Sequence, residues 1–242
     1  MDFATALVEE NNAFADALRG ADPATPVTTC PGWTLKQLMR HVGRGDRWAA
    51  QIVADRLTVP LDPREVRNGK PPDDGAIEWL RGGAQQLVEA VQKTGGDTPV
   101  WTFIGPQPAS WWIRRRLHEV TVHRADAELA LGRDFHLAAD LAADGLTEWL
   151  ERVVLQAGGD GIPLSANQSL HLHAAGGGEW TLRSDGQTLQ LSPQHEKATV
   201  AVRGDATSLL LAMLRRIPAD DRRIAVFGDI EVWRGWLDHT PF

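Results

Sequence analysis

Hydrophobic residues in the first 160 positions recur every three or four residues, which is the spacing of amphipathic helices. Thr34 followed three residues later by Gln37 is a capping-box pattern, and it marks the start of one such helix. The pair Gly95-Gly96 marks the end of another. The pattern predicts helices over residues 2–19, 34–56, 74–94, 110–132 and 137–156.

Residues 57–73, between the second and third predicted helices, contain four prolines and few apolar side chains. Proline has no backbone N–H and cannot continue a helix. This segment is therefore predicted to be a long loop, and it is a candidate to border a ligand cleft.

After residue 160 the apolar residues alternate instead, and glycine-rich turn signals such as 176–178 separate short runs. This pattern predicts antiparallel strands over 170–174, 180–183, 189–191 and 199–202, then a helix over 205–214, a strand over 224–227 and a helix over 229–238. The change of period predicts an α+β fold class, with a helical bundle over residues 1–158 followed by a small α+β domain over 159–242.

Composition narrows the range of partners. The 242 residues carry a net charge of −7, and the 25 Lys and Arg are scattered along the chain, so neither nucleic acid nor an anionic membrane is an expected partner. No signal peptide and no run of 18 apolar residues is visible, which favours a cytoplasmic protein. A lone cysteine, Cys30, excludes an internal disulfide and a cysteine-rich metal site.

Glu119 and His123 stand four residues apart in a predicted helix, so both project from one face and can ligate one ion. His41, inside the predicted helix 34–56, supplies a third ligand if the two helices pack together. Two imidazoles and a carboxylate are a common zinc set with an open position, and they also suit iron or nickel. On spacing alone, an ordinary i,i+4 pair and a hydrogen-bonded histidine explain these residues equally well.

Other residues near this pair are candidates for supporting roles. A zincin motif would need histidine at position 122, which is Val122, so a zincin peptidase is not expected. Of the three arginines at 114–116, Arg114 and Arg115 are candidates to meet a substrate carboxylate, and those that do not are expected to be solvated. Asp126 is a candidate acceptor for a ligand imidazole, with a surface ion pair as the alternative.

Two stretches carry a family resemblance. T-T-C-P-G-W-T-L-K-Q-L-M-R-H-V-G-R at residues 28–44 and R-R-R-L-H-E-V-T-V-H-R-A-D-A-E at 114–128 resemble the two signatures of the mycothiol-dependent maleylpyruvate isomerase family. The C-terminal stretches 204–214 and 227–234 more weakly resemble its sterol-carrier-like module. The resemblance implies a DinB-like antiparallel four-helix bundle in which His41, Glu119 and His123 hold a divalent metal.

The resemblance also implies a function. The expected protein uses a divalent metal, zinc first, and the cofactor mycothiol in a thiol transferase or isomerase reaction on a small electrophilic substrate. Two alternatives stay open: a non-catalytic, metal-containing ligand-binding or stress-response protein, and a metal-dependent hydrolase in which bound water is the nucleophile. A monomer and a homodimer are both compatible with the sequence.

Overall fold

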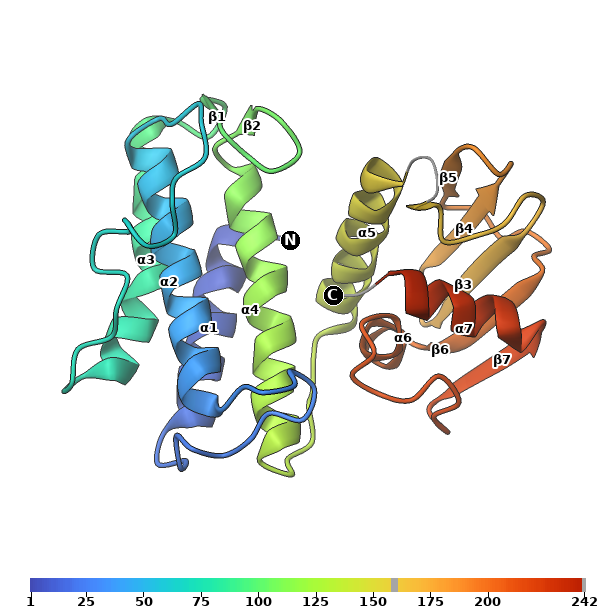
Figure 1. Cartoon of the computed structure of the whole chain (residues 1–242), viewed down its shortest axis with the longest axis horizontal. Coiled ribbons are helices and arrows are strands. Elements are labelled where there is room, and N and C mark those ends of the chain that lie inside the picture. Colours follow the sequence, from blue (N-terminus) through green and yellow to red (C-terminus); the bar gives the residue numbers. More distant parts are fainter. Residues whose placement is uncertain (158–160, 241–242) are drawn as a thin grey trace. The chain divides into compact units, whose positions relative to one another are not determined.

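The computed structural model describes residues 1–157 and 161–240, which form two compact units, Met1–Phe135 and His136–Phe242 (Figure 1). The first unit is helical, and the second combines helices with a sheet. The predicted α+β fold class, a helical region followed by an α+β domain, is confirmed.

The division between the units differs from the predicted one. The predicted boundary at 158/159 lies outside the described residues, whereas the observed division follows Phe135. The reason is the packing of α5 (Ala139–Gln156), which contacts α6 (Ala206–Met213) and β5 (Leu189–Ser192) of the second unit. The amphipathic pattern of α5 correctly predicted a helix, but it does not specify the partner of the apolar face.

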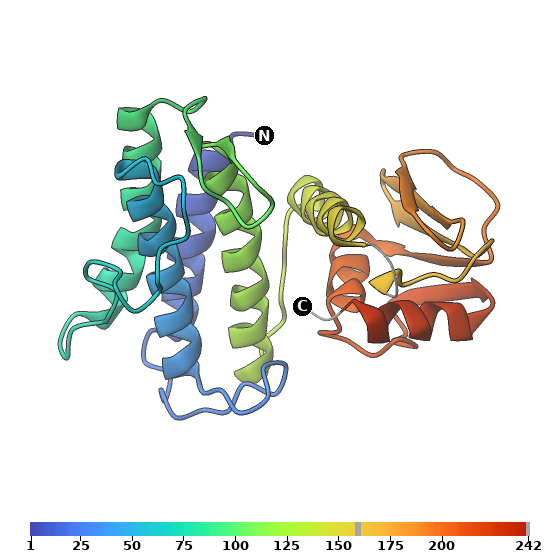
Figure 2. The same cartoon turned by 45° about the horizontal axis from the view of Figure 1, so that its top comes forward.

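The first unit is a bundle of four helices that lie side by side in both views (Figures 1 and 2). Fully buried leucines from each helix, Leu7, Leu38, Leu87 and Leu117, contribute to its core. The predicted capping box is present, with the Gln37 carboxamide oxygen accepting the Thr34 backbone N–H at 2.8 Å. The helices are α1 (Phe3–Leu18), α2 (Leu35–Ala54), α3 (Ala76–Thr94) and α4 (Trp111–Ala130).

The bundle was predicted to be antiparallel, but two neighbouring pairs of its helices are parallel. Gly43 of α2 packs against Trp79 near the start of α3, and the Thr94 hydroxyl at the end of α3 donates to the Val53 carbonyl near the end of α2. These contacts make α2 and α3 parallel. The cause is the connection 55–75, which runs back along the bundle and begins α3 at the end where α2 begins (Figure 1).

Contacts between α1 and α4 establish the relative direction of these two helices. Glu10 pairs with Arg124 at 2.9 Å, and the Ala17 carbonyl accepts from Arg133 at 3.0 Å, so these two helices are also parallel. A short antiparallel pair, β1 (Pro99–Val100) and β2 (Gln107–Pro108), precedes α4 and is too brief to produce a periodic signal.

Trp112, the second residue of α4, belongs to the core of the bundle. Trp112 is 1% exposed, and its ring packs edge-on against those of Trp48 and Trp111 at centroid distances of 5.2 and 5.0 Å. Its indole N–H donates to the Trp101 carbonyl at 3.1 Å, which satisfies the buried polar atom.

The second unit contains a five-stranded sheet in the order β5-β4-β3-β6-β7. The four strands predicted to be antiparallel are present, but β3 and β6 pair in parallel. The chain leaves β5 at one edge and crosses over β4 and β3 before β6, so β6 enters in the direction of β3. The strands are β3 (Ser169–Ala175), β4 (Glu179–Ser184), β5 (Leu189–Ser192), β6 (Val200–Asp205) and β7 (Ile224–Gly228).

One face of this sheet is apolar and is covered by helices. Leu170, Leu172 and Leu182 are fully buried on it, and the Trp180 indole N–H on the same face donates to Thr147 of α5 at 2.9 Å. Helix α6 (Ala206–Met213) follows β6, and helix α7 (Ile230–His239) follows β7. None of the described helices is long and apolar enough to cross a membrane.

Candidate metal centre

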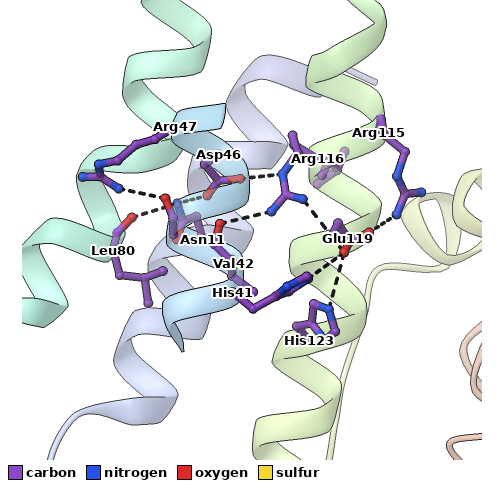
Figure 3. A network of polar contacts seen from close by, with 12 residues as sticks. Asn11, His41, Val42, Asp46, Arg47, Leu80, Arg115, Arg116, Glu119 and His123 are labelled. Carbon is purple, nitrogen blue, oxygen red and sulfur yellow. Dashed lines mark hydrogen bonds and ion pairs between the residues drawn. The ribbon is translucent and has the colours of Figure 1, made fainter. Parts of the chain in front are cut away.

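Helices α2 and α4 lie side by side in opposite directions and bring three predicted ligands together (Figure 3). The Glu119 Oε1 atom is 3.1 Å from His41 Nε2 and 3.5 Å from His123 Nε2. One donor atom from each of the three side chains lies within 4.8 Å of the other two. Two imidazoles and one carboxylate at this separation fit a zinc ion or another first-row divalent metal.

The cluster is open on the side of His41. The His41 side chain is 41% exposed, whereas that of His123 is 5% exposed. The ring of Trp33 lies beside both imidazoles, with centroids 5.0 Å from His41 and 6.4 Å from His123. Trp33, which precedes the first residue of α2, therefore forms one wall of the site.

Two arginines of α4 stabilise the ionised form of Glu119. Arg115 pairs with Oε2, and Arg116 Nη1 lies 3.9 Å from Oε1. Burial opposes ionisation, but Arg115, the two imidazoles and Arg116 together hold the pKa of Glu119 well below its usual range. Glu119 is therefore a carboxylate at neutral pH, as a metal ligand must be.

Arg116 is itself held by a buried network that reaches α1 (Figure 3). Its Nε donates to Asp46 at 2.8 Å, and the other oxygen of Asp46 accepts from Asn11 at 3.3 Å. Asp46 is fully buried and Arg116 is 6% exposed. Gly45 makes room for the guanidinium, because a Cβ there would lie 2.7 Å from two of its nitrogens.

A hydrogen bond at the second ring nitrogen, Nδ1, orients the His123 side chain. Its Nδ1 bonds Asp126 at 2.8 Å, and Asp126 also accepts from the Thr29 hydroxyl at 2.6 Å and the Cys30 thiol at 3.3 Å. These contacts leave Nε2 facing Glu119 and His41. Burial opposes protonation, but the hydrogen bonds of Asp126, Cys30 and Glu119 raise the pKa of His123 to about 10.

The remaining predicted site residues, Asp126 and the arginines at 114–116, differ in their distance from the cluster. Asp126 bonds the His123 imidazole, and Arg115 contacts the Glu119 carboxylate. Arg114 lies away from the cluster, with its guanidinium carbon 5.9 Å from the centre of the Phe3 ring. The expectation that the other arginines are solvated was wrong, because Arg115 and Arg116 are 5% and 6% exposed.

A cationic cavity of about 660 Å³ lies between α2 and the loop predicted to border a cleft. Arg44 belongs to it and lies three residues after His41, on the same side of α2. Sequence reasoning missed this cavity because its charges come from two separate segments. Its cationic residues are Arg40, Arg44, Arg64 and Lys70.

Residues 4–128 match the family described as Mycothiol maleylpyruvate isomerase N-terminal domain, and residues 140–235 match its C-terminal domain. The chain belongs to the mycothiol maleylpyruvate isomerase family. The two family matches are separated near residue 135, where the structure also divides into two units. The family resemblance drawn from the two signature stretches is confirmed.

Relatives and solved structures agree with the family. Uncharacterized proteins from two strains of Mycobacterium tuberculosis are each 26% identical over 168 residues, which cover 68% of this chain and 87% of the relative. The crystal structure of the mycothiol-dependent maleylpyruvate isomerase superposes with a TM-score of 0.63 at 16% identity, covering 93% of this chain and 91% of that one. A single-histidine mutant of that enzyme gives a TM-score of 0.62 at 18% identity and covers 89% of each chain. These superpositions show the shared fold.

The charge state of His123 predicts how metal binding to this cluster would depend on pH. In the metal-free protein, protonated His123 adds stability that is fully present below its unfolded pKa of 6.5 and is lost as the pH rises through about 10. Zinc needs the neutral imidazole and must displace this proton. We expect zinc affinity to rise by roughly tenfold per pH unit between about pH 6.5 and 8.

Calorimetry in two buffers of different ionisation enthalpy measures the released proton directly. Asp126→Asn is the matched variant, since it removes the carboxylate that raises the pKa of His123, and it should release less of a proton at pH 7. A binding heat that is independent of the buffer in the wild-type protein would contradict this prediction.

Proposed function

We propose that this chain is a zinc-dependent isomerase that uses mycothiol to act on a small, electrophilic carboxylate. The observation that carries the proposal is the convergence of His41, Glu119 and His123. A cationic cavity lined partly by Arg40 and Arg44, on the same helix as His41, adds support. Membership of the mycothiol maleylpyruvate isomerase family supports the choice of thiol and of reaction.

The three side chains would hold the metal, and the neighbouring residues would keep them in place. A divalent cation bound there supplies the charge that lowers the pKa of a thiol to give a thiolate at neutral pH. Arg115 holds the second oxygen of Glu119, and Asp126 fixes the tautomer of His123. The Trp33 ring limits water access on one side.

The cavity beside the site supports an anionic substrate. Arg40, Arg44, Arg64 and Lys70 bring four cationic groups to one concave surface, and guanidinium groups bind carboxylates through paired hydrogen bonds. Such a surface would hold the carboxylates of a small dianion while its double bond faces the thiol. It would also attract the anion from solution.

The proposed reaction balances without an external oxidant or reductant. The thiolate sulfur forms a bond to one carbon of the substrate's double bond, and the electron pair of that bond moves onto the conjugated carbonyl oxygen. The former double bond is then single and can rotate. Return of the electron pair expels the sulfur, reforms the double bond in the trans geometry and regenerates the thiolate.

Isomerisation of maleylpyruvate by the purified, zinc-loaded protein tests the proposal. Conversion to the trans isomer should require mycothiol in catalytic amount, with mycothiol recovered unchanged by mass spectrometry. A stoichiometric thioether product would instead identify a transferase. Consumption of maleylpyruvate at the same rate without any thiol would contradict both reactions, and hydrolysis products in that sample would indicate a hydrolase.

Replacement of Arg44 by alanine should weaken substrate binding while leaving the metal in place. A charge-assisted hydrogen bond contributes about 1.5–3 kcal/mol, so KM for a dianionic substrate should rise by roughly 10- to 100-fold with little change in kcat. Steady-state kinetics and metal analysis on the same sample measure both effects. Lys36→Ala, on the same helix but outside the cavity, is the matched control. An unchanged KM in the Arg44 variant would exclude the cavity as the anion site.

A further inference from the structure

A second group of histidines surrounds one carboxylate in the C-terminal unit, on the sheet face opposite the apolar one. His171 and His173 stand two residues apart on β3 and therefore project from the same face. Glu179 on β4 is the direct cross-strand partner of His173. His195 comes from the connection between β5 and β6, so three separate segments meet at this carboxylate.

The three imidazoles occupy both oxygens of Glu179. His171 Nε2 lies 2.5 Å from Oε2, while His173 Nδ1 and His195 Nδ1 lie 2.5 and 3.3 Å from Oε1. The rings of His171 and His195 meet edge-on with centroids 4.7 Å apart. His171 is 3% exposed, whereas the His195 side chain is 72% exposed, so the cluster extends from the protein interior to its surface.

This cluster has the same donor set as the site between α2 and α4. One donor atom each from His171, Glu179 and His195 lies within 4.8 Å of the other two, as in the first site. Ligands of a tetrahedral zinc stand roughly 3.3 Å apart, so side-chain shifts of about 1 Å would complete the geometry. His173 bonds the carboxylate from the other side and would fix its orientation.

We propose that His171, Glu179 and His195 form a second binding site for zinc or a similar first-row divalent metal. The donor set favours such a metal over calcium or magnesium, which prefer oxygen ligands. His173 is a positioning residue at this site. The proposal does not depend on the proposed isomerase activity.

The second metal would tie the connection 193–199 to the sheet. Contacts with β4 already hold part of that segment: the Thr181 hydroxyl donates to the Gln194 carbonyl at 2.7 Å, and Arg183 reaches Glu196 at 2.6 Å and the Lys197 carbonyl at 3.0 Å. A metal bridging His195 to β3 and β4 would add a stronger cross-link at the same place. Zinc should therefore slow amide exchange in residues 194–199.

Zinc titration of the full chain tests the second site once the first has been removed. In the variant His41→Ala/His123→Ala, we expect one zinc ion per chain to remain bound after dialysis against micromolar zinc. Adding His195→Ala should lower that affinity by at least about 100-fold, since even residues that only orient ligands contribute 10- to 100-fold. His173→Gln should lower it by roughly 10-fold.

The controls separate metal binding from folding. His239→Ala changes an exposed histidine of the same unit, bonded to the Gly235 carbonyl, and should leave the affinity unchanged. Because His195 is exposed, its variant should unfold at the wild-type temperature in the presence of a chelator. The proposal is overturned if the first-site variant binds no zinc, or if affinity survives both His195→Ala and Glu179→Gln.

Discussion

Replacement of His123 by alanine is expected to abolish stoichiometric zinc binding between α2 and α4 and to reduce mycothiol-dependent turnover by roughly 1000-fold or more. His123 contributes one of the three donor atoms, and its ring is fixed by Asp126 and faces the other two. Charge stabilisation by a catalytic metal is worth several kcal/mol, which corresponds to about three powers of ten in rate.

The fold should survive this substitution. Glu119 keeps Arg115 and Arg116 as partners when His123 is removed. The buried Asp126 loses its His123 partner but keeps hydrogen bonds from Thr29 and Cys30, so the variant should be less stable than the wild type and still fold. His136→Ala, an exposed histidine outside both clusters, should retain metal and turnover. Zinc should be counted in a His195→Ala background, which removes the proposed second site. Full turnover and stoichiometric zinc in the His123 variant would contradict the assignment.

Replacement of Asp46 by alanine is expected to lower the free energy of unfolding by about 3–5 kcal/mol. Asp46 is fully buried and accepts from Arg116 and Asn11. Its removal leaves the buried Arg116 guanidinium without its nearest carboxylate, and the Glu119 carboxylate at 3.9 Å compensates the charge only in part, which causes most of the loss. Urea unfolding followed by tryptophan fluorescence measures the change.

Two further variants decide whether the buried charge is the cause. Asp46→Ala combined with Arg116→Met removes both partners and should recover much of the lost stability, since replacing a whole buried pair is often close to neutral. Glu231→Ala breaks the exposed pair with Arg234 and should cost less than about 1 kcal/mol. A double variant as unstable as Asp46→Ala would show that cavity formation dominates instead.

Local features of the fold were predictable from the sequence, whereas the partners of each element were not. The capping box at Thr34 and the glycines after Thr94 predicted where two helices begin and end. The pattern of α5 did not reveal that its apolar face covers a sheet, so the boundary was placed too late. Similarly, alternation predicted β3 and β6 but not their parallel pairing, which depends on the path of the chain between them.

The same distinction between local patterns and long-range partners applies to the candidate site. Spacing proposed Glu119 and His123 as a half-site, and the signature around His41 supplied the third residue, so all three were predicted together. Asp46 was not singled out, because its contact with Arg116 joins positions 70 residues apart. The alternation of His171 and His173 is visible in the sequence, but only strand register places Glu179 beside them.

Cobalt spectroscopy tests the central claim most directly, namely that His41, Glu119 and His123 hold a metal that takes up the mycothiol sulfur. The protein is loaded with one equivalent of cobalt in the His195→Ala background and titrated with mycothiol. A sulfur-to-metal charge-transfer band should appear in this protein and be absent after the additional change His123→Ala. An unchanged spectrum on addition of mycothiol would contradict the account.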